Sequence, residues 1–187
     1  MSIRARIEDA FIAFSLGRPE AALLSVLTAI SATSRRRRPR GTPSVTDPSR
    51  EMGDREAFEL FSHEQMPIIC RVQNYNLRFR GEMHRLEHIL YRWIRCELAH
   101  EAGLPSDVHF VADERPGVVM IALDETGLRI SHGFLDGLAD AVIQAPENTD
   151  HFGAPPRPPL PIHIPRMNLT ILAAEEVHLP ASAAEAT

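Results

Sequence analysis

The sequence predicts an α+β domain made mainly of a helical bundle, with a small antiparallel β-meander and a Pro-rich C-terminal tail. Apolar residues recur at helical spacing through much of the first 101 positions, and the spacing changes to every second residue after Pro105. Eight of the 15 prolines fall between Pro146 and Thr187. We therefore expect a single domain over residues 1–150 and a tail over residues 151–187.

The composition is that of a globular protein with one sizeable core, since 44% of the 187 residues are apolar and 24% are charged. The net charge of −5 excludes a global attraction to nucleic acid or membranes, so any anion-binding site must be local. Ala21–Ile30, the longest apolar run, is too short to span a bilayer. Glu8 and Asp9 argue against a signal peptide, and two cysteines without metal-type spacing favour a reduced cytoplasm.

The first two predicted helices form a hairpin. Ser2 is a suitable N-cap for the first helix, Gly17 ends it, and Pro19 suits the first position of the second. A further helix is expected over Asp54–Phe61, whereas Pro67 leaves residues 63–75 ambiguous between helix and strand. Alternating residues predict strands around positions 108–110, 118–122 and 128–130, and Ser131 begins a last helix that reaches about Gln144.

A dense run of arginines lies between the second and third predicted helices. Five of the six residues from Arg35 to Arg40 are arginine, and a loop rich in Pro, Ser and Thr follows to about Arg50. Such a run could bind phosphate. The favoured interpretation is a loop whose charges meet nearby acidic residues.

Residues 81–101 predict one long amphipathic helix with a broad buried face and a narrow basic stripe. The stripe contains His84, Arg85, His88, Arg92 and Arg95. Because arginine presents a two-pronged fork to phosphate oxygens, Arg85, His88 and Arg92 are candidate phosphate or RNA ligands. The alternative is a solvated face that pairs with acidic residues.

His84, Glu87 and His88 also spell H-x-x-E-H, a pattern found in some zinc hydrolases. Two histidines four residues apart on a helix could reach one ion, with Glu87 as the base. A convincing third ligand is missing from the sequence. We therefore expect no metal here and no other cofactor.

Arg95 and His100 spell R-x4-H within LYRWIRCELAHEAGL. This segment resembles the motif helix of the HEPN superfamily. The resemblance is to an uncharacterised bacterial subset of that superfamily. The resemblance implies RNA binding and cleavage without metal, with Arg95 contacting the scissile phosphate and His100 acting in acid–base catalysis. Cys96 stands where active members often have a polar residue, and on a straight helix the two side chains point about 140° apart.

The HEPN resemblance also implies a two-fold homodimer in which two motif helices complete one site. The alternative is a non-enzymatic interaction or structural protein with the same bundle, in which Arg95 and His100 have structural roles. The tail contains apolar residues such as Ile162 and Ile164. We expect it to be ordered and to pack on the domain or on a second subunit.

Overall fold

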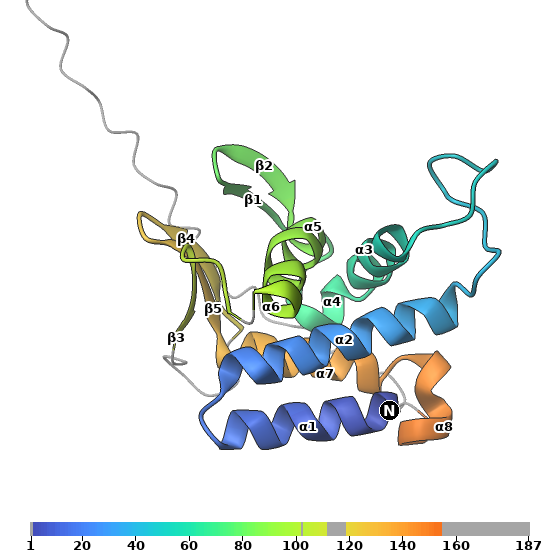
Figure 1. The fold of residues 1–187 in the computed structure, drawn as a ribbon, viewed down its shortest axis with the longest axis horizontal. Helices are drawn as coiled ribbons and strands as arrows, with labels where there is room; N and C mark the ends of the chain where they lie inside the picture. The colour runs from blue at the N-terminus through green and yellow to red at the C-terminus, as the bar shows by residue number, and fades with distance from the viewer. Residues whose placement is uncertain (1, 102, 112–118, 155–187) are drawn as a thin grey trace, which may run out of the picture. The chain divides into compact units, whose positions relative to one another are not determined.

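The computed structural model describes residues 2–101, 103–111 and 119–154, and its fold is α+β (Figure 1). Met1–Pro156 form one compact unit. Apart from residues 151–154, the predicted tail lies outside the described residues, and so does its predicted packing. The helices are α1 (Ile3–Ser15), α2 (Pro19–Arg37), α3 (Asp54–Glu64), α4 (Met66–Ile69), α5 (Leu86–Ile89), the π-helical η1 (Leu90–Arg95), α6 (Cys96–His100), α7 (His132–Ile143), the 3-10 turn η2 (Pro146–Asn148) and α8 (Thr149–Phe152).

The N-terminal hairpin of α1 and α2 forms as predicted. The Ser2 hydroxyl accepts a hydrogen bond from the Ala5 amide at 3.1 Å, and Gly17 adopts a left-handed φ of 70° at the turn. Pro19 begins α2. The prediction that the arginine run lies in a loop was partly wrong, because Arg35–Arg37 form the last turn of α2. Cationic side chains are favourable there beside the negative end of the helix dipole.

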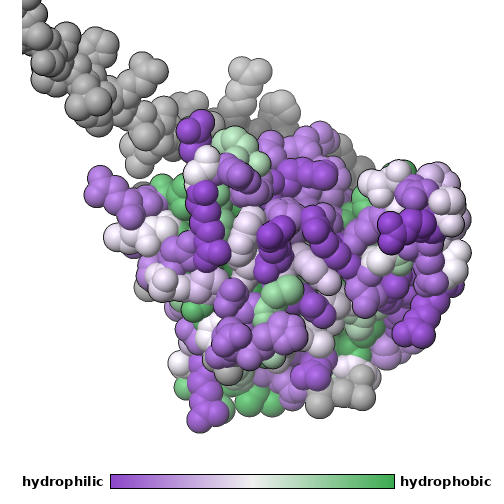
Figure 2. Space-filling model, turned by 45° about the horizontal axis from the view of Figure 1, so that its top comes forward, coloured by the Kyte–Doolittle hydropathy of each residue, from purple (hydrophilic) through white to green (hydrophobic). Residues whose placement is uncertain are grey.

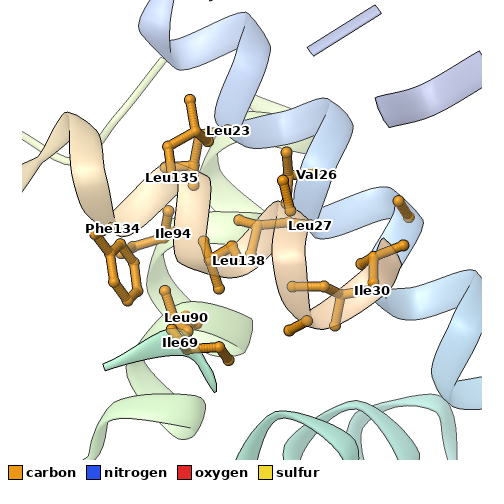
Figure 3. Packing of buried hydrophobic residues seen from close by; sticks show 14 of the residues in the cluster. Leu23, Val26, Leu27, Ile30, Ile69, Leu90, Ile94, Phe134, Leu135 and Leu138 are labelled. Carbon is orange, nitrogen blue, oxygen red and sulfur yellow. The ribbon is translucent and has the colours of Figure 1, made fainter. Parts of the chain in front are cut away.

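The core forms where α2 meets α7 and the helical segment of α5 and η1 (Figure 3). Apolar side chains from one face of α2 interdigitate with Leu135 and Leu138 of α7. These α2 residues are Leu23, Val26, Leu27 and Ile30, all fully buried. Each such side chain contributes about 2 kcal/mol by leaving water. At Gly137 a Cβ atom would lie 2.4 Å from the Ile69 carbonyl oxygen, so α4 and α7 approach too closely for a larger residue.

The predicted meander was wrong in its strand order. The sheet of β3 (Val108–Val111), β4 (Ile121–Asp124) and β5 (Gly127–Ser131) has the order β3-β5-β4, with β3 parallel to β5 and β4 antiparallel to it. Alternating apolar residues predict which side chains face inward, but not which strands pair. The parallel pairing depends on Gly127, where an added Cβ would lie 2.1 Å from the Asp107 carbonyl oxygen.

A β-hairpin that the sequence did not predict lies where the long helix was expected to begin. β1 (Asn76–Phe79) pairs antiparallel with β2 (Glu82–Arg85), and α5 begins only at Leu86. Arg80 and Gly81 form the turn with left-handed φ values of 52° and 85°, as a two-residue turn of this twist requires. The predicted single helix over residues 81–101 was therefore wrong at its N-terminal end, and η1 interrupts the α-helical repeat further on.

Candidate functional site: a tryptophan cluster beside a groove

The hairpin separates the H-x-x-E-H residues onto two elements. His84 lies on β2, whereas Glu87 and His88 lie on α5. The two imidazoles stack with their centroids 5.4 Å apart, but Glu87 turns inward, is 2% exposed and bonds to His63. Across the described ranges, no group of three or more His, Cys, Asp or Glu side chains is arranged to hold a metal ion.

The R-x4-H residues lie in different surroundings. The Arg95 Nε donates a hydrogen bond to the Ser31 hydroxyl at 2.9 Å, and its guanidinium lies over the Tyr91 ring at 5.2 Å. His100, the last residue of α6, is exposed. Within the part of the chain that is described, no hydrogen bond connects these two side chains. Arg95 thus ties η1 to α2, and His100 faces solvent.

The structure gathers three residues of the basic stripe, together with Arg80, around the single tryptophan. The guanidinium of Arg92 lies 5.5 Å from the Trp93 ring centroid, and that of Arg80 lies 5.7 Å from it. The rings of His84 and His88 approach Trp93 edge-on at 4.7 and 5.2 Å. We call these five residues the Trp93 cluster. Sequence reasoning missed Arg80 because the β1–β2 hairpin that brings it there was not predicted.

The cations of this region differ in how fully carboxylates neutralise them. Arg80 forms a two-pronged ion pair with Asp107 at 2.7 and 2.8 Å, which holds the pKa of Asp107 below its usual value. Arg85 is 63% exposed and has one long contact, at 3.6 Å, with Glu87. Arg92 is exposed, and no carboxylate among the described residues lies within 4 Å of its guanidinium. Arg92 and Arg85 are therefore the most available cations here.

A groove of about 630 Å³ lies beside α3. It is formed by the loop before α3, the outer face of that helix and the end of β2. Its lining residues include Ser44, Arg50, Arg55, Glu59, His63 and Arg85. Figure 1 shows α3 and the β1–β2 hairpin in the upper part of the molecule. Figure 2 turns this part toward the viewer, and the surface seen there is mostly hydrophilic. Four carboxylates (Asp47, Glu51, Glu56 and Glu59) line the groove together with three arginines and His63, so charges of both signs face a ligand there.

Two histidine–carboxylate pairs connect the groove to α5. The His63 Nδ1 lies 3.1 Å from a carboxylate oxygen of Glu87, and the His88 Nδ1 lies 2.9 Å from one of Glu59. Arg55 contacts both Glu59 and the His88 ring. Sequence reasoning had Arg85 and His88 as candidates, but it missed His63, whose partner is 24 positions away.

A model of the Rv1289 family matches residues 2–154. The chain belongs to the Rv1289 family. The match covers the domain that carries both the Trp93 cluster and the groove. No curated protein and no solved structure matches the chain. Among the residues whose structure is described, no helix has the length and apolar character needed to cross a membrane.

Proposed function

We propose that this Rv1289-family protein binds single-stranded RNA at the Trp93 cluster and the adjoining Arg85. The observation that carries the proposal is the convergence of Arg80, Arg92, His84 and His88 on one tryptophan, with the charge of Arg92 left unpaired among the described residues. Proteins that bind single strands combine cations that follow the backbone with aromatic side chains. A guanidinium over a ring still presents its N–H edge to phosphate.

The electrostatics favour a short, local contact. With a net charge of −5, the protein as a whole repels a polyanion, so binding depends on the few cations that face the strand. Affinity should therefore fall steeply with salt. A cytoplasmic location is part of the proposal, because RNA is available there.

The test uses Trp93 as an intrinsic probe, since it is the chain's single tryptophan. Titration with a labelled single-stranded RNA should quench Trp93 fluorescence and raise the anisotropy of the label. Arg92→Ala should weaken binding about 5-fold, because one arginine–phosphate contact contributes on the order of 1 kcal/mol. Arg4→Ala, on the exposed face of α1, is the matched control. Binding that does not quench Trp93, or that Arg92→Ala leaves unchanged, would refute the proposal.

A second candidate is RNA cleavage by Arg95 and His100, as the HEPN resemblance implies. Its support is the exposure of His100 at the end of α6. Cleavage should then persist in EDTA and be lost in His100→Ala without loss of stability. RNA binding with no cleavage in the parent would favour a non-enzymatic interaction protein.

The homodimer is likewise a proposal. α1 and its C-cap residue expose three large apolar side chains, since Phe11 is 50%, Ile12 58% and Leu16 65% accessible. A two-fold contact would remove them from water. Light scattering at micromolar concentration should give twice the monomer mass, and a monomer would refute the proposal.

A further inference from the structure

We infer that His63 is the acid–base group of a catalytic site in the groove, which cleaves the RNA strand held by the Trp93 cluster. The identity of the substrate rests on the proposed function. The site itself rests on the groove, on the buried carboxylate behind His63 and on the arginines beside it. It is distinct from the R-x4-H pair.

The pairing with Glu87 determines which imidazole nitrogen is available. Glu87 is 2% exposed, and a carboxyl group buried so deeply needs hydrogen-bond partners. The His63 Nδ1 lies 3.1 Å from this carboxylate, and in the tautomer that donates the Nδ1 proton to it, Nε2 is the acceptor nitrogen. His63 itself is 36% exposed and lines the groove. A buried acid behind an accessible histidine orients the ring as a base.

Other groove residues complete a site for a phosphodiester. Arg55 and Arg85 line the same groove as His63, and the Arg85 side chain is 63% exposed. Four carboxylates line this groove, of which Glu51 is exposed and Asp47 accepts from Ser49. The other two are engaged by residues of the groove wall. Glu56 accepts from the Ser44 hydroxyl and the Val45 amide, and Glu59 accepts from Arg55 and bonds to His88. The arginines can therefore contact a phosphate while these carboxylates stay satisfied.

His88 links the groove to the Trp93 cluster. Its ring packs edge-on against Trp93, and its Nδ1 bonds to Glu59 of the groove wall. Arg85 follows His84 of the cluster on β2 and lines the groove. The Trp93 cluster and the groove are therefore adjacent and joined through His88 and Glu59.

The reaction needs neither metal nor oxidant. The His63 Nε2 takes the proton from a ribose 2′-hydroxyl, whose oxygen bonds to the adjacent phosphorus. The bond from phosphorus to the 5′ oxygen breaks, and that oxygen takes a proton from solvent. His63 then returns its proton to solvent. The products are a 2′,3′-cyclic phosphate and a free 5′-hydroxyl, and Arg85 stabilises the charge that develops on phosphorus.

The test compares His63→Gln and Glu87→Gln with His109→Gln, a control on β3 whose Nε2 lies 3.2 Å from the Thr126 carbonyl oxygen. We expect the full-length protein to cleave single-stranded RNA in EDTA and leave cyclic phosphate ends. His63→Gln should lower the rate about 100-fold or more, and RNA affinity should stay within about 2-fold. Glu87→Gln should lower the rate less and move the acid limb of the pH–rate profile, which a merely structural residue would not do. His109→Gln should match the parent.

Several results would overturn the inference. RNA binding without cleavage would refute the catalytic site in the groove and would still agree with the proposed function. Absence of RNA binding would refute both. Cleavage that His100→Ala abolishes and His63→Gln spares would assign catalysis to the R-x4-H pair. If His63→Gln lowers the melting temperature, the pH–rate profile of Glu87→Gln decides, and a profile identical to the parent's refutes the acid–base role.

Discussion

Two groups of arginines in this protein differ in how many carboxylates they meet. In the run at the end of α2, Arg35 pairs with Asp54, Arg36 with Asp150 and Arg38 with Glu64. Arg37 pairs with both Glu64 and Glu147. Around Trp93, in contrast, Arg92 meets a ring and no described carboxylate, and Arg85 makes one long contact. The part of the favoured interpretation that concerns charge is confirmed for Arg35–Arg38, whose guanidinium groups meet acidic residues.

The difference shows that the density of arginine in sequence says little about phosphate binding. The run is the most basic stretch of the chain, yet its charges connect α2 to α3, η2 and α8. Arg85 and Arg92 remain available because the fold places fewer acids beside them. The availability of an arginine for phosphate depends on the number of carboxylates within reach of its guanidinium.

The largest expected effect is on stability, from Arg37→Ala. Arg37 bonds to both carboxylate oxygens of Glu147 at 2.6 and 3.0 Å, bonds to Glu64 and lies over the Phe61 ring at 4.8 Å. Losing these partly buried contacts should cost about 2–3 kcal/mol in the free energy of unfolding, measured by urea denaturation. RNA affinity should not change. A matched Arg4→Ala variant, which loses an exposed pair with Glu8, should cost under about 0.5 kcal/mol.

The same ion pair predicts how stability depends on pH. Burial pushes the pKa of Glu147 up. The hydrogen bonds from Arg37, a backbone hydrogen bond and the charges of Arg37 and Arg38 together outweigh it and hold the pKa below its usual value. A carboxylate whose pKa is lower in the folded state stabilises the protein above its unfolded-state pKa. That contribution is lost as the pH falls through the folded-state pKa. Melting temperatures measured at decreasing pH should therefore fall more steeply for the parent than for Arg37→Ala, and parallel curves would contradict this.

Arg92→Ala should show the opposite pattern to Arg37→Ala. Its free energy of unfolding should stay within about 0.5 kcal/mol of the parent, since its guanidinium contacts only a ring among the described residues. The plot of log affinity for single-stranded RNA against log salt should become shallower by about 0.7, the value for one lost phosphate contact. An unchanged slope would mean that Arg92 does not face the strand.

The smallest expected effect tests whether a carboxylate makes an arginine unavailable. Asp107→Asn releases Arg80 from its ion pair while the side chain keeps its size. RNA affinity should rise about 2-fold, and stability should fall by under about 1 kcal/mol because both groups are partly exposed. Lower RNA affinity would show that Arg80 needs Asp107 to hold its position beside Trp93.

Local signals in the sequence located several elements correctly. The Ser2 cap, Gly17 and Pro19 predicted the α1–α2 hairpin, and Ser131 marked the start of α7. The β1–β2 hairpin was missed because His84 and His88 fit a helical stripe as well as a strand followed by a helix. The turn at Arg80–Gly81 places a non-glycine residue at a left-handed φ, which composition alone does not reveal.

The amino-acid sequence by itself determined the fold class, the helical hairpin and the presence of a histidine- and arginine-rich segment near Trp93, because caps, turns and hydrophobic periodicity act over a few residues. The tertiary structure decided which of those side chains meet. It turned Glu87 inward to His63, brought Arg80 to Trp93, and gave the arginine run its carboxylates from α3, η2 and α8. These contacts join residues distant in sequence, and their partners are set by how helices and strands pack rather than by any local pattern.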